Sequence, residues 1–184
     1  MLKSINHRGP DNSRKFVDQN LYLGSTRVKI LDLDNRSNMP MEIDDFVIVY
    51  NGEIYNHKIL KKKLEDLGEK FLTTSDTKVI LRLFKKYEYD SFKLLEGMFS
   101  VCIYNKKNKK LILARDIFGI KPLYYTFYNN NFIFSSEVNS IKKNLDYNLK
   151  KNQLAIYSFL HKGSIIESQT QYKSLYSLKP GIYL

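Results

Sequence analysis

Residues 50–56 read Tyr50-Asn51-Gly52-Glu53-Ile54-Tyr55-Asn56 and separate a short apolar run from an amphipathic segment. The apolar run, 46–50, is rich in β-branched and aromatic residues and has the length of a strand. Asn-Gly is a strong signal for a two-residue hairpin turn, so a hairpin is the first interpretation. The residues that follow do not favour it, because leucines recur at helical spacing through 60–67 and Asn56 is a good helix N-cap. We therefore predict a strand followed directly by a helix.

The Asn-Gly pair also has a chemical interpretation. The side-chain amide of Asn51 and the backbone N–H of Gly52 are both hydrogen-bond donors, and the predicted strand would hold them at its end. Fixed donors of this kind stabilise the negative charge that develops on a carbonyl oxygen during nucleophilic attack. Asn51 and Gly52 are therefore candidate oxyanion-hole residues.

The rest of the chain predicts helices and strands in mixed order. A second helix is expected after Ser75, which can cap it, with Asp76 in its first turn and one apolar stripe from Val79 to Tyr87. Short polar turns between successive strands in the centre of the chain indicate antiparallel pairing. Several of these strands are apolar at consecutive positions, so helices should cover both sides in an α+β layered architecture. Strands or short apolar runs are expected at 21–23, 30–31, 98–104, 111–114, 124–128, 132–135 and 175–178, and weaker helices at 136–143 and 152–161.

The composition excludes several classes of protein. The 184 residues are 43% hydrophobic, which suffices for one substantial core. No apolar run approaches the roughly 18 residues of a membrane span, and the first residues lack the apolar region of a signal peptide, so we expect a cytoplasmic protein without a membrane partner. Cys102 is the only cysteine and the three histidines are scattered, so neither a disulfide nor a metal site is expected.

The formal net charge of +11 raises the question of nucleic-acid binding. Only six of the 30 basic residues are Arg, and many of the lysines lie in turn-like or helical stretches such as 61–63 and 106–110. Lys is less suited than Arg to bidentate recognition of bases and phosphates. A solvated basic surface is therefore the preferred interpretation, and no specific nucleic-acid partner is expected.

The segment Asn51-Gly52-Glu53-Ile54-Tyr55-Asn56 resembles a signature segment of asparagine synthetases, and seven further segments resemble motifs of that family in the same order. The resemblance covers essentially the whole chain and identifies residues 1–184 as an incomplete type 2 glutamine amidotransferase domain without the synthetase domain. It implies a four-layer αββα sandwich of the N-terminal-nucleophile hydrolase type that lacks its first strands. The seven segments are His7-Arg8-Gly9-Pro10-Asp11, 23–33, Ser75-Asp76-Thr77, 95–99, 114–125, 134–137 and 178–181.

The resemblance also implies roles for particular residues. Arg27 would hold the α-carboxylate of L-glutamine, as a guanidinium fork is suited to do. Asp76, helped by Glu53, would accept a hydrogen bond from the α-ammonium group. Asn51 and Gly52 would form the oxyanion hole. Two plainer interpretations stay open, namely that Asp76 is only a first-turn helix acid and Arg27 only a surface cation.

Other residues of the family motifs would shape or support this site. Val28, Ile30 and Leu31 would line the glutamine pocket. The segment from Arg115 to Pro122 is interpreted as structural, with a buried ion pair between Arg115 and Asp116 and a turn at Lys121-Pro122.

The nucleophile of the resembled family is a cysteine at the mature N-terminus, whose own α-amine acts as the general base. Residues 1–184 contain no such cysteine, and Cys102 lies in a predicted strand where it would pack as a small apolar residue. We therefore expect this chain to be part of a longer enzyme and inactive alone. Unpaired strand edges and an uncovered core would then favour instability or self-association, for example as a homodimer.

The reaction implied by the resemblance has two stages. Glutamine is hydrolysed to glutamate and ammonia, and the ammonia amidates aspartate with ATP in a separate domain. ATP and Mg²⁺ would belong to that domain, so no cofactor is expected in residues 1–184, and the expected partners are L-glutamine and the asparagine synthetase C-terminal domain. Two alternatives stay open: a non-catalytic module that binds glutamine or docks a partner, and the glutaminase domain of an amidotransferase that acts on sugar carboxylates.

Overall fold

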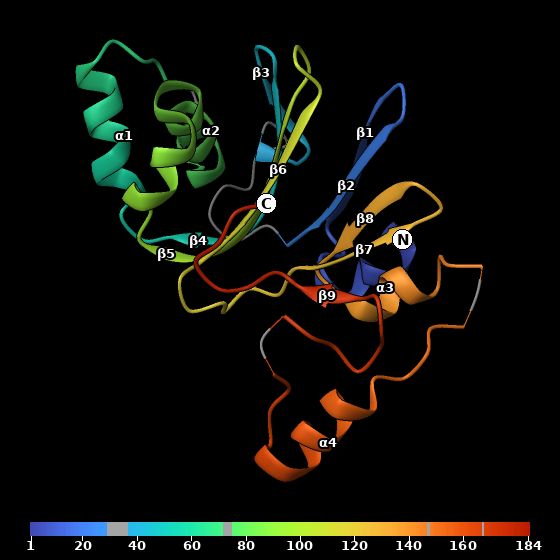
Figure 1. The fold of residues 1–184 in the computed structure, drawn as a ribbon. Coiled ribbons are helices and arrows are strands. Elements are labelled where there is room, and N and C mark those ends of the chain that lie inside the picture. Colours follow the sequence, from blue (N-terminus) through green and yellow to red (C-terminus); the bar gives the residue numbers. More distant parts are fainter. Residues whose placement is uncertain (29–36, 72–74, 147, 167) are drawn as a thin grey trace.

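The computed structural model describes residues 1–28, 37–71, 75–146, 148–166 and 168–184, and the structural statements below concern these ranges. Within them, the strands form a two-stranded, a four-stranded and a three-stranded sheet (Figure 1). The four-stranded sheet makes one layer, and the other two sheets face it from the opposite side of the core.

The four-stranded sheet has the order β3-β4-β5-β6 and is antiparallel throughout. Its long central strands are buried on both faces, as their consecutive apolar residues predict. The end of the chain extends this sheet, because Leu113 and Leu184 exchange backbone hydrogen bonds of 2.9 and 2.8 Å. The strands are β3 (Met41–Ile43), β4 (Phe46–Ile54), β5 (Gly97–Asn105) and β6 (Lys110–Arg115).

Helices α1 (His57–Asp66) and α2 (Asp76–Tyr87) cover one face of this sheet, and the 3-10 helix η3 (Glu88–Leu94) follows α2 (Figure 1). Phe84 of α2 packs edge-on against Phe46 of β4, with 5.8 Å between the ring centroids. The predicted strand-to-helix connection is confirmed, because β4 runs unbroken through Ile54 and α1 begins three residues later. Leu67 departs from the predicted apolar face, since it lies beyond α1 and is 55% exposed.

Neither predicted N-cap acts through its side chain. Asn56 occupies the N-cap position of α1, but its amide donates to the Leu94 carbonyl at 2.9 Å and its Oδ1 accepts from the Glu96 N–H at 3.2 Å. Ser75 occupies the N-cap position of α2 and also forms no side-chain capping bond. The Asn56 side chain therefore ties the end of β4 to the segment before β5, a tertiary contact that helix propensity does not encode.

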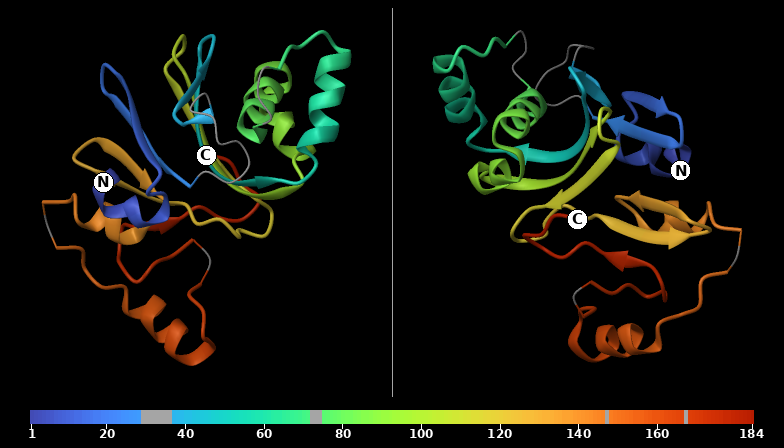
Figure 2. Two further views of the ribbon diagram at one scale, coloured as in Figure 1. Left: turned by 180° about the vertical axis from the view of Figure 1, so that it is seen from behind. Right: turned by 45° about the horizontal axis from the view of Figure 1, so that its top comes forward.

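The second layer contains a hairpin and a three-stranded sheet, with α3 on its outer side (Figure 2). Phe132 and Phe134 of β8 pack against the main core, whereas Ile133 between them packs against a second cluster that contains Ile141 of α3. This alternation makes β8 the partition between the core and α3. The order helix, sheet, sheet, helix confirms the predicted α+β architecture. The elements are η1 (Leu2–Arg8), β1 (Asn12–Asp18), β2 (Leu21–Arg27), β7 (Tyr124–Tyr128), β8 (Asn131–Ser135), α3 (Val138–Lys142) and β9 (Tyr176–Ser177).

Antiparallel pairing of successive strands is confirmed for β5 with β6 and for β7 with β8. The prediction is wrong for β6 and β7, because residues 116–123 carry the chain from one layer to the other. The predicted run at 30–31 lies outside the described residues.

Arg115 and Asp116 hold this crossover, but not by the ion pair that the sequence predicts. The Asp116 carboxylate accepts four backbone N–H groups at 3.0–3.2 Å. The Arg115 guanidinium donates to backbone carbonyls and to the Ser177 hydroxyl. Within the described residues, each side chain is thus satisfied by the chain around it rather than by the other. The donors to Asp116 are Phe99, Phe118, Ile120 and Lys121, and the carbonyl acceptors of Arg115 are those of Gly119, Lys121 and Leu178.

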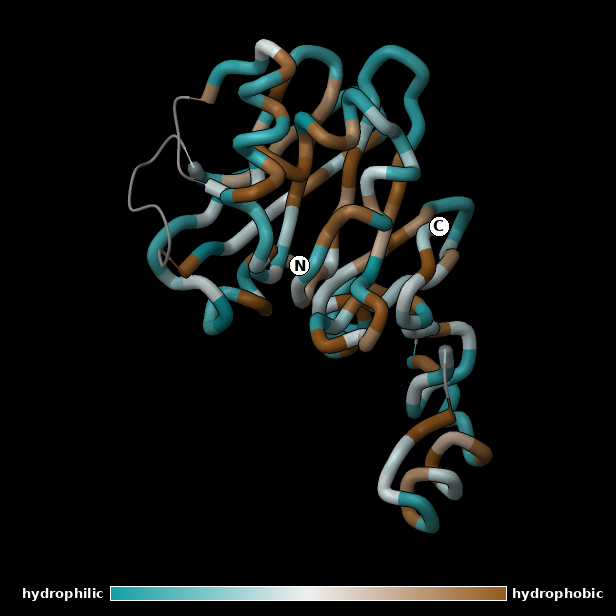
Figure 3. The backbone as a smooth tube through the Cα atoms, turned by 90° about the vertical axis from the view of Figure 1, so that its left-hand side faces the viewer, coloured by the Kyte–Doolittle hydropathy of each residue, from teal (hydrophilic) through white to brown (hydrophobic). Residues whose placement is uncertain are grey.

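Helix α4 (Gln153–Lys162) stands apart from the two layers (Figures 1 and 2). The Asn152 side chain caps it by accepting from the Ala155 N–H at 3.3 Å, and Gly163 ends it in the left-handed region. Apolar residues recur along this helix (Figure 3), and Leu154, Tyr157 and Leu160 are each more than half exposed. Among the described residues, no helix is long and apolar enough to cross a bilayer.

Replacement of Asp116 by Asn should lower the free energy of unfolding by about 2–4 kcal/mol, because an amide cannot accept all four backbone N–H groups. Burial raises the pKa of Asp116, but the backbone donors outweigh burial and hold the pKa below its ordinary value of 3.8. A lowered pKa contributes stability that is present above pH 3.8 and is lost as the pH falls through the folded-state pKa. In urea unfolding curves, the free energy of unfolding of Asp116→Asn should therefore fall less steeply with decreasing pH than that of the wild type. The exposed Asp90 offers a control, and equal effects of Asp90→Asn and Asp116→Asn would contradict the assignment.

Candidate functional site

The candidate oxyanion-hole residues lie near the end of β4, where successive side chains point to opposite faces of the sheet. The Tyr50 side chain points toward α2, because its hydroxyl reaches Asp76 there. Asn51 lines the cavity on the other face, together with Ser100 and Cys102 of the neighbouring β5. One face of β4 thus contributes the contact with Asp76, and the other face contributes Asn51 to the cavity wall.

The Asn51 amide nitrogen is buried and has no hydrogen-bond partner within the described residues. A buried donor without an acceptor costs roughly 1–3 kcal/mol. Most buried polar groups in folded proteins are paired, so an orphaned amide at a cavity wall indicates a position where a ligand oxygen can bind.

Gly52 presents its backbone N–H at the edge of β4 that does not face β5. Its partner across the sheet is Phe99, whose N–H donates to Asp116 Oδ2 at 3.1 Å and whose carbonyl accepts from the Asp116 N–H at 2.9 Å. Because the N–H and the carbonyl of Phe99 both point toward β6, Gly52 and Phe99 form a non-hydrogen-bonded pair. The Gly52 N–H therefore points outward, and no acceptor for it is found in the part of the chain that the structure describes.

The Asp76 carboxylate is fixed at the same edge of β4. Its Oδ2 accepts from the Tyr50 hydroxyl at 2.7 Å and from the Ile54 N–H at 3.1 Å. Asp76 stands in the first turn of α2, but within the described residues both hydrogen bonds of its carboxylate come from β4. The contacts thus favour a site role for Asp76 over the interpretation as a helix acid.

Arg27 ends β2 and lies near the start of α2 through a chain of contacts. Its Nη1 donates to Asn38 Oδ1 at 2.8 Å, and the next residue, Met39, accepts at Sδ from the Thr77 hydroxyl at 4.0 Å. Thr77 follows Asp76, so two of the predicted glutamine contacts converge on one region. The half-buried Arg27 is not the free surface cation of the plainer interpretation.

The remaining predicted residues fall into two groups. Glu53 is half-buried and shares the Asn51 face of β4. Val28 is 45% exposed at the end of β2. Ile30 and Leu31 lie outside the described residues.

A cavity of about 910 Å³ separates the two layers. Its wall includes Leu23 of β2, Asn51 of β4, Cys102 of β5 and Phe132 of β8. Arg27, Gly52, Glu53 and Asp76 are not part of this wall. Asn51 therefore stands where the cavity meets the polar edge of β4.

Cys102 lies on the cavity face of β5, between Val49 and Leu113, and is 2% exposed. Burial raises the pKa of its thiol above the ordinary value of 9.0. A thiol in this state is inert, which agrees with the prediction that Cys102 is a core residue. No group of three or more metal-ligating His, Cys, Asp or Glu side chains occurs within the described ranges.

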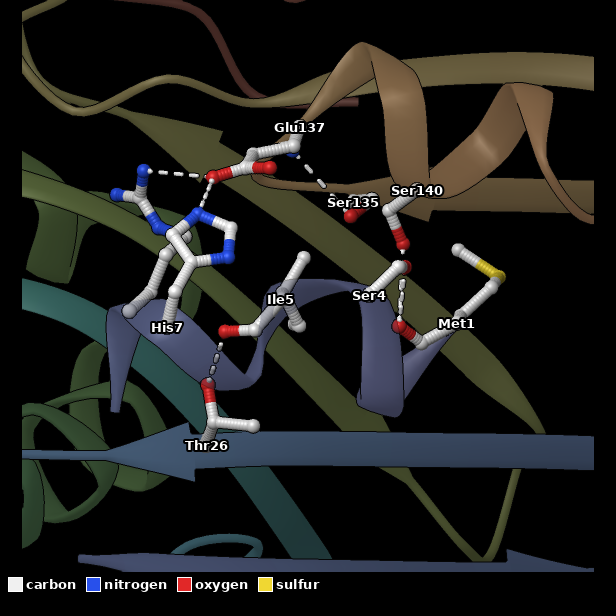
Figure 4. A network of polar contacts seen from close by, with 9 residues as sticks. Met1, Ser4, Ile5, His7, Thr26, Ser135, Glu137 and Ser140 are labelled. Carbon is white, nitrogen blue, oxygen red and sulfur yellow. Dashed lines mark hydrogen bonds and ion pairs between the residues drawn. The ribbon is translucent and has the colours of Figure 1, made fainter. Parts of the chain in front are cut away.

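A polar network that the sequence did not predict joins two motifs that lie far apart in the sequence, 7–11 and 134–137 (Figure 4). His7 Nε2 and Arg8 Nη1 lie 2.8 and 3.3 Å from the same oxygen of Glu137. Next to this pair, the Thr26 hydroxyl donates to the Ile5 carbonyl at 3.3 Å. Thr26 precedes Arg27, so the network supports the end of β2. In the sequence, the only sign of this network is that the motifs at 7–11 and 134–137 are both present.

The fold defines the class of protein first. The structure is similar to that of glutamine phosphoribosylpyrophosphate amidotransferase from Bacillus subtilis, with a TM-score of 0.57 and 19% sequence identity over 86% of this chain and 34% of that one. At this identity the likeness establishes the fold, which is that of N-terminal-nucleophile hydrolases.

The sequence comparisons then define the family. The model of the glutamine amidotransferase domain matches residues 1–184, and the chain belongs to that family. It is 37% identical, over 97% of its length, to a Methanocaldococcus jannaschii protein named as a glutamine-hydrolysing asparagine synthetase. It is 42% identical, over 77% of its length, to the glutamine-hydrolysing asparagine synthetase 1 of Bacillus subtilis. The resemblance found from the motifs is confirmed. The chain spans 38% and 22% of the lengths of these two relatives.

Replacement of Gly52 by Ala should lower the free energy of unfolding by about 3 kcal/mol or more, because the new Cβ would lie 2.1 Å from the Met98 carbonyl oxygen. The backbone of β5 would have to move away from β4. Gly24→Ala is the control, since a Cβ there meets the flexible end of the Leu2 side chain. Urea unfolding measures both variants, and equal losses would contradict the close approach of β4 and β5.

The Cys102 thiol should react slowly with iodoacetamide at pH 8 in the folded protein and rapidly in denaturant, because only an exposed thiolate is alkylated. Mass spectrometry over time measures the modified fraction. Labelling of folded protein at the rate of the denatured chain would contradict the burial of this side chain.

Proposed function

We propose that residues 1–184 bind L-glutamine and hold its side-chain amide for hydrolysis to glutamate and ammonia. The unpaired, buried amide of Asn51 is the observation that carries this proposal. With the outward Gly52 N–H, it supplies two donors for the oxygen that becomes negative when the glutamine amide carbon is attacked.

The ligand would be oriented by groups of opposite charge. Arg27 binds the α-carboxylate, and Asp76, with Glu53 nearby, binds the α-ammonium group. Val28, Ile30 and Leu31 contribute apolar contacts. The contact chain from Arg27 through Asn38 and Met39 to Thr77 supports this assignment, because it links the two charged groups that a free amino acid needs.

The attacking thiol comes from outside residues 1–184. Cys102 lies on the correct face of the sheet, but it is buried and its thiol pKa is raised. A thiol with a nearby amine as base would attack the amide carbon, ammonia would leave, and water would hydrolyse the thioester to glutamate. The cavity of about 910 Å³ beside Asn51 is the space from which this thiol would approach.

The released ammonia would amidate aspartate in an ATP-dependent synthetase domain, which also holds Mg²⁺. The names of the relatives support this acceptor, and an amidotransferase that acts on sugar carboxylates is the alternative. The buried state of Cys102 favours a second candidate function, in which residues 1–184 only bind glutamine.

Calorimetric titration of residues 1–184 with L-glutamine tests the binding step. Saturable binding is expected, and Arg27→Met should weaken it roughly 30-fold because a charge-assisted bidentate contact is lost. The exposed Arg14 of β1 offers the control Arg14→Met, which should bind like the wild type. A wild-type protein that does not bind glutamine would refute the proposal, as would equal losses in the two variants.

Hydrolysis separates the two candidate functions. A longer chain with an N-terminal cysteine should release ammonia from glutamine, and residues 1–184 should not. Binding without hydrolysis by the longer, folded chain would favour the binding module.

A further inference from the structure

We propose that Tyr50 is a positioning residue, which fixes Asp76 so that the free edge of β4 selects a ligand with the charge and length of glutamine. The inference rests on the proposed function. Its starting point is that Tyr50 and Ile54 both donate to one oxygen of Asp76, Oδ2, at 2.7 and 3.1 Å.

The two oxygens of the Asp76 carboxylate differ in their hydrogen-bond partners. Both hydrogen bonds of Asp76 within the described residues fall on Oδ2, so Oδ1 is the acceptor that remains for a ligand. Tyr50 and Asp76 are 7% and 4% exposed. Burial and the nearby carboxylate raise the pKa of the Tyr50 hydroxyl above its ordinary value of 10.0, so the hydroxyl stays a donor. With the Ile54 N–H alone, the carboxylate could rotate and move Oδ1.

The spacing of the N–H groups along β4 is comparable to the length of glutamine. The N–H groups of Ile54 and Gly52 leave the same edge of β4, two residues apart, which is about 7 Å at the usual rise of a strand. The amine nitrogen and the amide carbon of glutamine are four bonds apart, or about 5 Å when extended. Hydrogen bonds at the two ends of the ligand cover the remaining distance. The edge therefore accommodates an ammonium group at Asp76 and an amide oxygen at Gly52 in one ligand.

The nearest cation along α2 lies beside an aromatic ring. Lys78 follows two residues after Asp76 on α2, and its Nζ lies 5.9 Å from the centroid of the Phe71 ring. Among the described residues, no ion pair of Asp76 is found. The α-ammonium group of the ligand is thus the cation that this carboxylate is placed to receive.

The test compares two ligands and two Tyr→Phe variants in residues 1–184. Calorimetry is carried out with L-glutamine and with glutaramate, which lacks the α-amino group. Tyr50→Phe should weaken glutamine binding roughly tenfold and change glutaramate binding by less than about twofold. Tyr104→Phe is the matched control, because the Tyr104 hydroxyl donates to Asp18 at 2.8 Å on another strand. This control should bind both ligands like the wild type.

The outcomes separate the inference from the function on which it rests. Equal glutamine affinities of Tyr50→Phe and wild type overturn the inference and leave the proposed function intact. A wild-type protein without glutamine binding overturns the proposed function. Should Tyr50→Phe fail to fold, NMR of the wild type with ¹³C-labelled tyrosine gives the answer. The Tyr50 signal should then shift with glutamine while that of Tyr104 stays, and an unmoved Tyr50 signal at saturation overturns the inference.

Discussion

The exchange of backbone hydrogen bonds between Phe99 and Asp116 determines how the candidate site is presented. Each residue of a strand points its N–H and carbonyl to one side only, and Phe99 uses both on Asp116. Its neighbour across the sheet, Gly52, is consequently turned toward the open edge of β4. The Asp116 carboxylate also holds the start of the crossover between the layers. A change at Asp116 would therefore disturb the fold and the donor at Gly52 together.

The alternation of β4 divides the chemistry between two faces of one strand. Tyr50 turns toward α2 and holds Asp76, while Asn51 turns toward the cavity and keeps an unpaired amide. Gly52 has no side chain, and the close approach of β5 leaves room for none. A shift of the register by one residue would exchange the two faces and bring the Asn51 amide to the helices. The pairing of β4 with β5 thus fixes the site as firmly as any side chain in it.

The sequence was informative where a local pattern reports directly on packing. The leucines of 60–67 and the consecutive apolar residues of β4 and β5 predicted these elements correctly, and the order of motifs led to the family. The sequence was uninformative where a side chain acts across the fold. Asn56 binds the 94–96 segment instead of capping α1, and Arg115 and Asp116 bind backbone groups rather than each other. The strand β1 was missed because Phe16 and Val17 are its only apolar residues, and β3 because three residues show no periodicity. From the sequence, Tyr50 is simply part of an apolar strand, because nothing in the residues next to it in the chain identifies Asp76 as its partner.

Nearness to the proposed oxyanion donors, Asn51 and Gly52, does not by itself make a thiol catalytic, and Cys102 illustrates the distinction. Cys102 lies opposite Val49, and Asn51 shares this face of the sheet. The side chains of Cys102 and Asn51 are therefore diagonal neighbours, about 7–8 Å apart. Cys102 is shielded from water, and burial stabilises the protonated form of its thiol. A thiol attached to a free amine would carry its own base, and it would need to approach Asn51 from the cavity rather than from within the sheet. For the proposed hydrolysis, the direction from which the sulfur approaches Asn51 therefore matters more than the number of cysteines.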